Sequence, residues 1–243
     1  MMEARRRRRE RIVELLRKRD SAAIAASAVA AGPRQLMMLD SLTYTFAYDD
    51  LMRWRAIEAA GVTAAALDER YPEAPREFVR RQFWLMSDES GATAWYAAEL
   101  AGEVLFSVPR LIEDQARPLL YFLDESPFER GAHYAVARIS EAAPSFFLED
   151  VPRLVRSLDD DDPYVRFYAA KALGQTGALS KYEGRVGGDG SLIAIYDRES
   201  GQVKSRSFGF AAGGVAEIKA QGIPGATRVS MNFSAEKDKE LSQ

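Results

Sequence analysis

Residues 158–177 read LDDDDPYVRFYAAKALGQTG, and this stretch indicates the fold. A helix start prefers a carboxylate N-cap followed by proline at the first helical position, which is the order of Asp162 and Pro163. Small and apolar residues then recur with helical spacing as far as Gly174. The stretch therefore predicts an amphipathic helix capped by Asp162. The alternative for residues 159–162 is a divalent cation site, but the run lacks the glycine and distal glutamate of a calcium loop.

The same pattern recurs earlier in the chain. Partial copies of residues 166–174 occupy residues 53–61, 95–102 and 130–140, and an alanine-rich segment ending at Gly32 is a fifth, weaker copy. Each copy follows another amphipathic stretch, and these stretches are residues 9–19, 35–48, 75–86, 107–123 and 146–158. Because one helical pair cannot bury both apolar faces alone, such pairs stack on their neighbours.

The sequence thus predicts a mainly α fold, an α-solenoid of about five helical hairpins over residues 1–177. Glycine at the end of a copy suits a left-handed helix C-cap, so we expect that role for Gly61, Gly102 and Gly174, as for Gly32. The arginine-rich first helix would cap one end of the stack.

The composition changes after Gly177, so residues 178–243 form a second, smaller unit. A β-hairpin is expected from residues 192–196 and 203–210, joined by a turn at 197–201. A hairpin alone is only marginally stable, so it should dock on the last repeat as a cap. Beyond it we expect a short helix at 215–220, a possible strand at 227–233 and a frayed polar end at 234–243.

The repeat unit resembles a HEAT repeat of the phycobilisome-lyase-like type. The resemblance lies in the acidic turn, Pro163, the Val165-Arg166 pair, the Ala169-Ala170 pair and the closing Leu-Gly-x-x-Gly of residues 173–177. It implies an α-solenoid with a curved, partner-binding surface. It also implies that Arg53, Arg130 and Arg166 form a ladder with acidic residues of adjacent turns. The alternative is an anion-binding row, but a buried guanidinium needs such acidic partners.

Composition excludes several kinds of chemistry. The 243 residues carry 33 basic and 36 acidic side chains, no cysteine and one histidine, His133. Thiolate sites, Cys nucleophiles and His-pair metal sites, including the iron site of the related deoxyhypusine hydroxylases, cannot be built. His133 is expected to be a packed structural residue, although a general acid or base is conceivable. Residues 187–190 could cradle phosphate but lack the Gly-Lys-Ser/Thr of a P-loop. No catalytic, cofactor or metal site is predicted.

The N-terminus superficially resembles a secretion signal, with arginines at 5–9 and an alanine-rich run at 22–31. The run is only weakly apolar, and acidic residues separate it from the arginines. No stretch approaches 18 apolar residues, so no membrane span is expected and the default location is the cytoplasm.

The position after the ladder arginine is normally polar because it faces out of the stack, yet here it is aromatic. Trp54, Trp95 and Phe167 occupy it, and four residues later on the same helical faces stand Glu58, Glu99 and Lys171. Uncovered aromatics at repeat spacing would anchor a partner. The alternative is that neighbouring helices or the C-terminal segment cover them. We therefore expect a non-catalytic adaptor that binds a protein or peptide on this ridge.

Two other functions stay open. The repeat type is named for phycobilin lyases, so a chromophore lyase or chaperone is possible by analogy of fold. Nucleic acid could bind the arginines at 5–9 and the basic, aromatic segment 76–84. Against this, residues 1–32 hold nine basic and four acidic groups, which leaves 24 basic against 32 acidic for the remaining chain.

Overall fold

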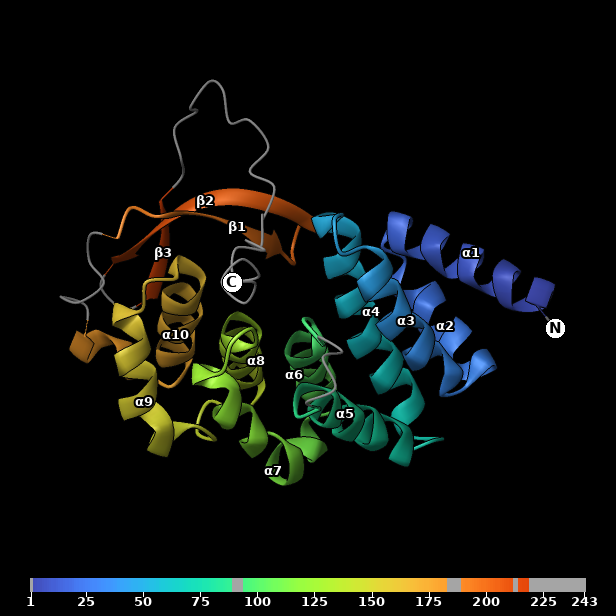
Figure 1. The fold of residues 1–243 in the computed structure, drawn as a ribbon, viewed down its shortest axis with the longest axis horizontal. Coiled ribbons are helices and arrows are strands. Elements are labelled where there is room, and N and C mark those ends of the chain that lie inside the picture. The colour runs from blue at the N-terminus through green and yellow to red at the C-terminus, as the bar shows by residue number, and fades with distance from the viewer. Residues whose placement is uncertain (1, 89–93, 183–188, 212–213, 219–243) are drawn as a thin grey trace, which may run out of the picture.

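A computed structural model describes residues 2–88, 94–182, 189–211 and 214–218. The protein is mainly helical and carries a small antiparallel sheet (Figure 1). The α-helices are α1 Met2–Lys18, α2 Ser21–Ala31, α3 Arg34–Thr45, α4 Asp50–Asp68, α5 Glu73–Met86, α6 Ala97–Ser107, α7 Ile112–Gln115, α8 Glu129–Ala142, α9 Val151–Arg156 and α10 Pro163–Gln175. Short 3-10 turns are η1 Pro109–Leu111, η2 Arg117–Asp124, η3 Leu148–Asp150, η4 Ser157–Asp159 and η5 Leu179–Tyr182.

Four helices form an inner row. Helices α4, α6, α8 and α10 pack in succession along an arc, with α5, α7 and α9 on its outer side (Figure 1). Their facing surfaces are rich in buried alanine, including Ala60, Ala101, Ala135 and Ala169. Small side chains let helix axes approach closely, which explains the alanine pairs of the repeated pattern. The segments expected as helices at 107–123 and 146–158 are broken into 3-10 turns around the short helices α7 and α9.

Two of the glycines expected at helix ends lie inside helices instead. A Cβ on Gly61 of α4 would lie 2.5 Å from Ser107 Oγ, and one on Gly102 of α6 would lie 2.6 Å from Ala135 Cα in α8. These glycines therefore permit helix crossings, and the expectation of C-caps at both positions is wrong. Gly174 also lies within α10, one residue before its end.

Left-handed caps occur at other glycines. Gly32 follows α2 with φ 67°, as expected. After α10 the left-handed residue is Gly177, with φ 74°. Its N–H donates to Gly174 O at 3.1 Å, and Ala178 N–H donates to Leu173 O at 2.9 Å. This pair of bonds is the Schellman arrangement, so Gly177 takes the role expected of Gly174.

The C-terminal sheet contains β1 Leu192–Asp197, β2 Gln202–Ala211 and β3 Gly214–Ile218 in the order β1-β2-β3. The hairpin agrees with expectation, and Asp197 pairs with Gln202 at its last register position. The helix expected at 215–220 is wrong, because residues 214–218 pair antiparallel with β2. The backbone hydrogen bonds of that segment are thus satisfied by strand pairing. The strand expected at 227–233 and the frayed end at 234–243 lie outside the described residues.

The hairpin reaches far beyond the last repeat. Near its base, Tyr164 of α10 bonds to Ala194 N at 3.1 Å. Its tip contacts Arg19 after α1 and Arg55 of α4, so β1 and β2 bridge the open side of the arc (Figure 1). Among the described residues, no helix is long and apolar enough to cross a membrane.

Candidate partner-binding site

The hairpin tip inserts an arginine between the inner helices. Arg198 forms ion pairs with Glu103 on α6 and with Glu58 on α4, the latter at 3.8 Å. It also donates a hydrogen bond to the Tyr134 hydroxyl on α8. Tyr196, two residues earlier, donates its hydroxyl to Glu58 at 2.7 Å. Three successive helices of the inner row thus supply one pocket for a single guanidinium.

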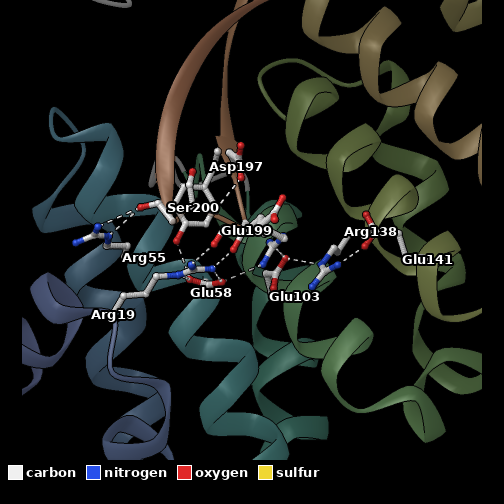
Figure 2. A network of polar contacts seen from close by, with 12 residues as sticks. Arg19, Arg55, Glu58, Glu103, Arg138, Glu141, Asp197, Glu199 and Ser200 are labelled. Atoms are coloured by element: carbon white, nitrogen blue, oxygen red, sulfur yellow. Dashed lines mark hydrogen bonds and ion pairs between the residues drawn. The ribbon is translucent and has the colours of Figure 1, made fainter. Parts of the chain in front are cut away.

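Glu103 is the centre of this pocket. It is 1% exposed and accepts hydrogen bonds from Tyr134 at 2.5 Å and from Arg138 Nε at 3.0 Å, besides its contact with Arg198. Arg138 also contacts Glu141, and Glu141 pairs with Lys171 of α10 at 2.7 Å. A chain of alternating charges therefore runs along the inner face from α4 to α10. Figure 2 shows it as far as Glu141. A buried carboxylate requires this degree of compensation.

The other side of the tip is held by two arginines from the first helices. Arg19 binds Glu58 with both Nε and Nη2, at 3.0 and 2.7 Å, and reaches the carbonyl of Glu199 at 3.2 Å. Arg55 donates to Gly201 O at 3.1 Å and to Arg17 O at 2.6 Å, so it joins α1 to the turn. Figure 2 shows these side chains beneath the tip.

Gly201 is required at the tip for two reasons. Its φ is 64°, a conformation that side chains with a Cβ rarely adopt. A Cβ there would also lie 2.4 Å from Arg19 Cδ. The turn therefore matches the surface beneath it in shape as well as in charge.

The network changes the acid strength of its members. Burial alone would raise the pKa of Glu58, but hydrogen bonds from Arg19 and Tyr196 lower it below its usual value. Burial raises the pKa of Tyr134 well above the usual tyrosine value, and burial together with Glu58 raises that of Tyr196. At neutral pH the pocket thus combines the charged carboxylate of Glu58 with two neutral phenols beside a guanidinium.

The six residues expected to bind a partner do not form one exposed ridge. Trp54 is half-buried, because Tyr196 of the hairpin stacks on it at 6.1 Å and Tyr134 packs at 4.8 Å. Phe167 is only 7% exposed, whereas Trp95 is 39% exposed. Of the three aromatics expected to form a discontinuous uncovered ridge, only Trp95 is exposed. The hairpin and the neighbouring helix α8 cover Trp54, as in the alternative considered from the sequence.

The charged members of that set have different surroundings. Glu58 belongs to the network beneath the hairpin through its ion pair with Arg19. Lys171 joins the same network through its ion pair with Glu141. Glu99 Oε2 instead is buried without a hydrogen-bond partner, where Gly131 leaves room for it. Burial raises the pKa of Glu99 to about 7, although Arg53 opposes the change. Sequence spacing could place Glu99 on the same helical face as Trp95. It could not show that the Oε2 atom of Glu99 is buried without a hydrogen-bond partner.

Two of the three ladder arginines reach the next unit along the chain. Arg130 of α8 pairs with Asp162, which also caps α10 by accepting from Tyr164 N at 2.9 Å. Arg166 pairs with Asp189 at 2.5 Å, just before β1. Arg53 differs, because its carboxylate partner is Asp50 of its own helix at 2.5 Å, and its guanidinium lies over the Tyr96 ring.

The single histidine has a partner that sequence reasoning missed. His133 Nδ1 lies 2.8 Å from the carbonyl oxygen of Glu129, so it must donate there and leave Nε2 to accept from Ser157 Oγ at 2.8 Å. The side chains are 1% and 9% exposed, which places the pair within the packed core. This hydrogen bond joins α8 to η4, and burial lowers the pKa of His133.

The two basic segments also differ from each other. In α5, Arg76 pairs with Asp114 and Arg80 with Glu77, so much of the positive charge of residues 76–84 is compensated. Residues 3–11 of α1 are all exposed, and only Arg6 and Arg7 form ion pairs with carboxylates of this part of the helix. The strongest uncompensated positive charge of the described chain therefore lies on α1.

Comparison with known proteins adds one relative. The chain is 26% identical over 161 residues to an uncharacterized protein of Archaeoglobus fulgidus, an alignment covering 64% of this chain and 84% of that protein. No protein-family model and no solved structure matches the chain.

The residues of the pocket that the sequence did not indicate are Glu103, Tyr134 and Arg198. A carboxylate at the inward position of the alanine-rich helix α6 was the available signal, because a buried charge needs a partner. Arg198, which pairs with Glu103, is 95 residues away from it along the chain, so only the tertiary fold identifies this contact.

Proposed function

We propose that the protein is a non-catalytic helical-repeat adaptor of the HEAT-like type, whose inner face binds an arginine-bearing turn of a partner protein. The observation that carries the proposal is the enclosure of Arg198 by Glu58, Glu103 and Tyr134. These residues come from three helices, and the segment that they hold is itself a short turn on two strands. The protein's own hairpin is then the resident occupant of the partner site.

The order of the helices supports the solenoid part of this proposal. Helices α4, α6, α8 and α10 contact one another in chain order, and Arg130 and Arg166 each pair with a carboxylate that follows in the next unit. This is the neighbour-to-neighbour contact pattern of stacked repeats.

The chemistry of the pocket supports selection of arginine. A guanidinium presents several N–H groups in one plane, so it can meet both carboxylates and the phenol oxygen at once. A lysine ammonium is a point charge and cannot span the three acceptors in the same way. Tyr196 stacks on Trp54 at an interplanar angle of 8°, which adds an apolar contact beside the charges.

A peptide with the sequence of residues 192–203, cyclised as a hairpin and fluorescently labelled, tests the proposal. Arg198→Ala in the full chain removes the resident guanidinium, so this variant should bind the peptide and wild type should not. A matched peptide with alanine at the position of Arg198 should bind at least about tenfold more weakly, since a charge-assisted contact contributes about 1.5–3 kcal/mol. Equal binding of the two peptides, or no binding to the folded variant, would contradict the proposal.

A second candidate function has its own observation, the exposed arginines of α1. Such a helix could contact the phosphates of a nucleic acid, whose affinity falls steeply with salt. Double-stranded DNA and RNA should then bind at low salt, and Arg5→Glu together with Arg8→Glu should abolish the binding. Absence of any gel retardation at low salt would eliminate this function.

A further inference from the structure

A second surface, separate from the inner face, lies between α3 and α5. It is a groove of about 880 Å³ lined mainly by apolar side chains, among them Leu36, Met37, Tyr71, Ala74, Phe78 and Trp84. Trp84 is 61% exposed and Met37 is 41% exposed. Large side chains of this kind on one open surface indicate a protein contact.

The exposed side chains of α5 form one stripe. The exposed residues of this helix follow at helical spacing and are Glu73, Glu77, Arg80, Arg81 and Trp84, whereas the residues between them are buried or partly buried. The N-terminal half of the stripe is acidic, and the C-terminal half is basic and aromatic. The stripe is therefore complementary in charge to a copy of itself that runs in the opposite direction.

We propose that this surface binds a second copy of the chain. The two α5 helices would run antiparallel on their exposed side, about a two-fold axis midway between Glu77 and Arg81. This register places Glu77 opposite Arg81 of the partner subunit, and the symmetry repeats the contact. It also places Trp84 opposite Ala74 of the partner subunit, where a small side chain leaves the groove open for an indole. A two-fold interface requires this kind of self-complementary patch.

The ion pair between Glu77 and Arg80 does not prevent this pairing. Glu77 pairs with Arg80 at 2.8 Å, but both side chains are about 60% exposed, so the pair contributes little and can be exchanged. A stable interface buries about 800 Å² on each partner, and one helix of this length with its neighbours supplies less. The dimer should therefore be weak, with a dissociation constant on the order of micromolar.

Sedimentation equilibrium of the full chain over a range of concentrations tests the proposal. Wild type should show a monomer–dimer equilibrium. Glu77→Arg places two arginines opposite each other, and Arg81→Glu places two glutamates opposite each other. Because the two-fold axis repeats this repulsion, each variant should associate at least about tenfold more weakly.

A one-to-one mixture of the two variants provides the decisive result. In the mixed pair each changed side chain faces an opposite charge, so dimers should form again with an affinity near that of wild type. This recovery also shows that both variants are folded.

Exposed aromatic residues supply the matched control. Trp84→Ala should weaken association, whereas Tyr48→Ala, at a fully exposed aromatic between α3 and α4, should not. Monomeric wild type at all concentrations, or a mixture that stays monomeric, would overturn the proposal. The result does not depend on whether the inner face binds an arginine-bearing turn.

Discussion

Glu103 shows how one residue ties the helices and the sheet together. This buried carboxylate accepts from α8 through Tyr134 and Arg138 and contacts Arg198 of the hairpin. Each of those donors is itself largely removed from water. A change at Glu103 therefore leaves several polar groups without a partner, and its effect should exceed that of any single lost hydrogen bond.

Glu103→Ala is expected to lower the free energy of unfolding by about 3–5 kcal/mol, because two guanidinium groups each lose one of their carboxylate partners inside the protein. Urea unfolding followed by circular dichroism measures the change. Glu113→Ala, at an exposed glutamate on α7, is the control and should change stability by less than about 0.5 kcal/mol. Similar values for the two variants would show that the network does not stabilise the fold.

Glu99 makes stability depend on pH. Below pH 4.5, its ordinary pKa, folded and unfolded chains both hold the proton. Between pH 4.5 and 7 the unfolded chain releases it while the folded chain keeps it, so stability falls as pH rises. Above the folded pKa of about 7 the loss is complete, and it amounts to about 3 kcal/mol.

Glu99→Gln removes this titration, so the variant should gain stability over wild type as pH rises from 5 to 8. Denaturant titrations of both proteins at several pH values give the difference. His133, whose lowered pKa reduces stability as pH falls below 6.5, contributes equally to both curves and cancels. A constant difference across this range would contradict the burial of Glu99.

At the scale of elements, the sequence predicted the helices better than their contacts. The expected stretches agree with α1, α3, α5 and the four inner helices, because helical periodicity is a local property. Gly61 and Gly102 were misread, since a glycine near the end of a repeat can permit a crossing as well as a C-cap. The reach of the hairpin, and with it the pocket for Arg198, depends on contacts between residues far apart in sequence.

Two glycine substitutions separate these roles. Gly102→Ala should destabilise the protein by about 1–3 kcal/mol, because the added methyl meets the α8 backbone. Gly174→Ala should stabilise it by up to about 1 kcal/mol, since alanine favours the helix and the nearest atom there, in Leu179, lies 3.8 Å away. Thermal unfolding of both variants checks the signs, and equal effects would contradict the assigned roles.

At the scale of the whole molecule, the hairpin connects the two ends of the helical arc. Its base contacts α10, and its tip contacts Arg19 and Arg55 of the first helices. Each helix of the inner row otherwise packs mainly on its neighbours. The hairpin therefore limits how far the arc can open.

Gly201→Ala should weaken the contact between the hairpin tip and the first helices. The alanine would adopt a strained backbone conformation, and its methyl group would collide with Arg19. The chain has no cysteine, so Lys18→Cys and Gln175→Cys allow selective spin labelling near the two ends. Pulsed electron paramagnetic resonance should show a broader distance distribution in the Gly201→Ala background. Gly190→Ala, where the added methyl has open space, should leave the distribution as in wild type.

The long separation between Glu103 and Arg198 has a consequence for synthesis of the protein. The ribosome releases helices α4, α6 and α8 before the residue that neutralises their shared carboxylate has been translated. Until then Glu103 lies in a charge cluster that lacks one cation and remains open to water. A chain that terminates before residue 198 never gains this cation.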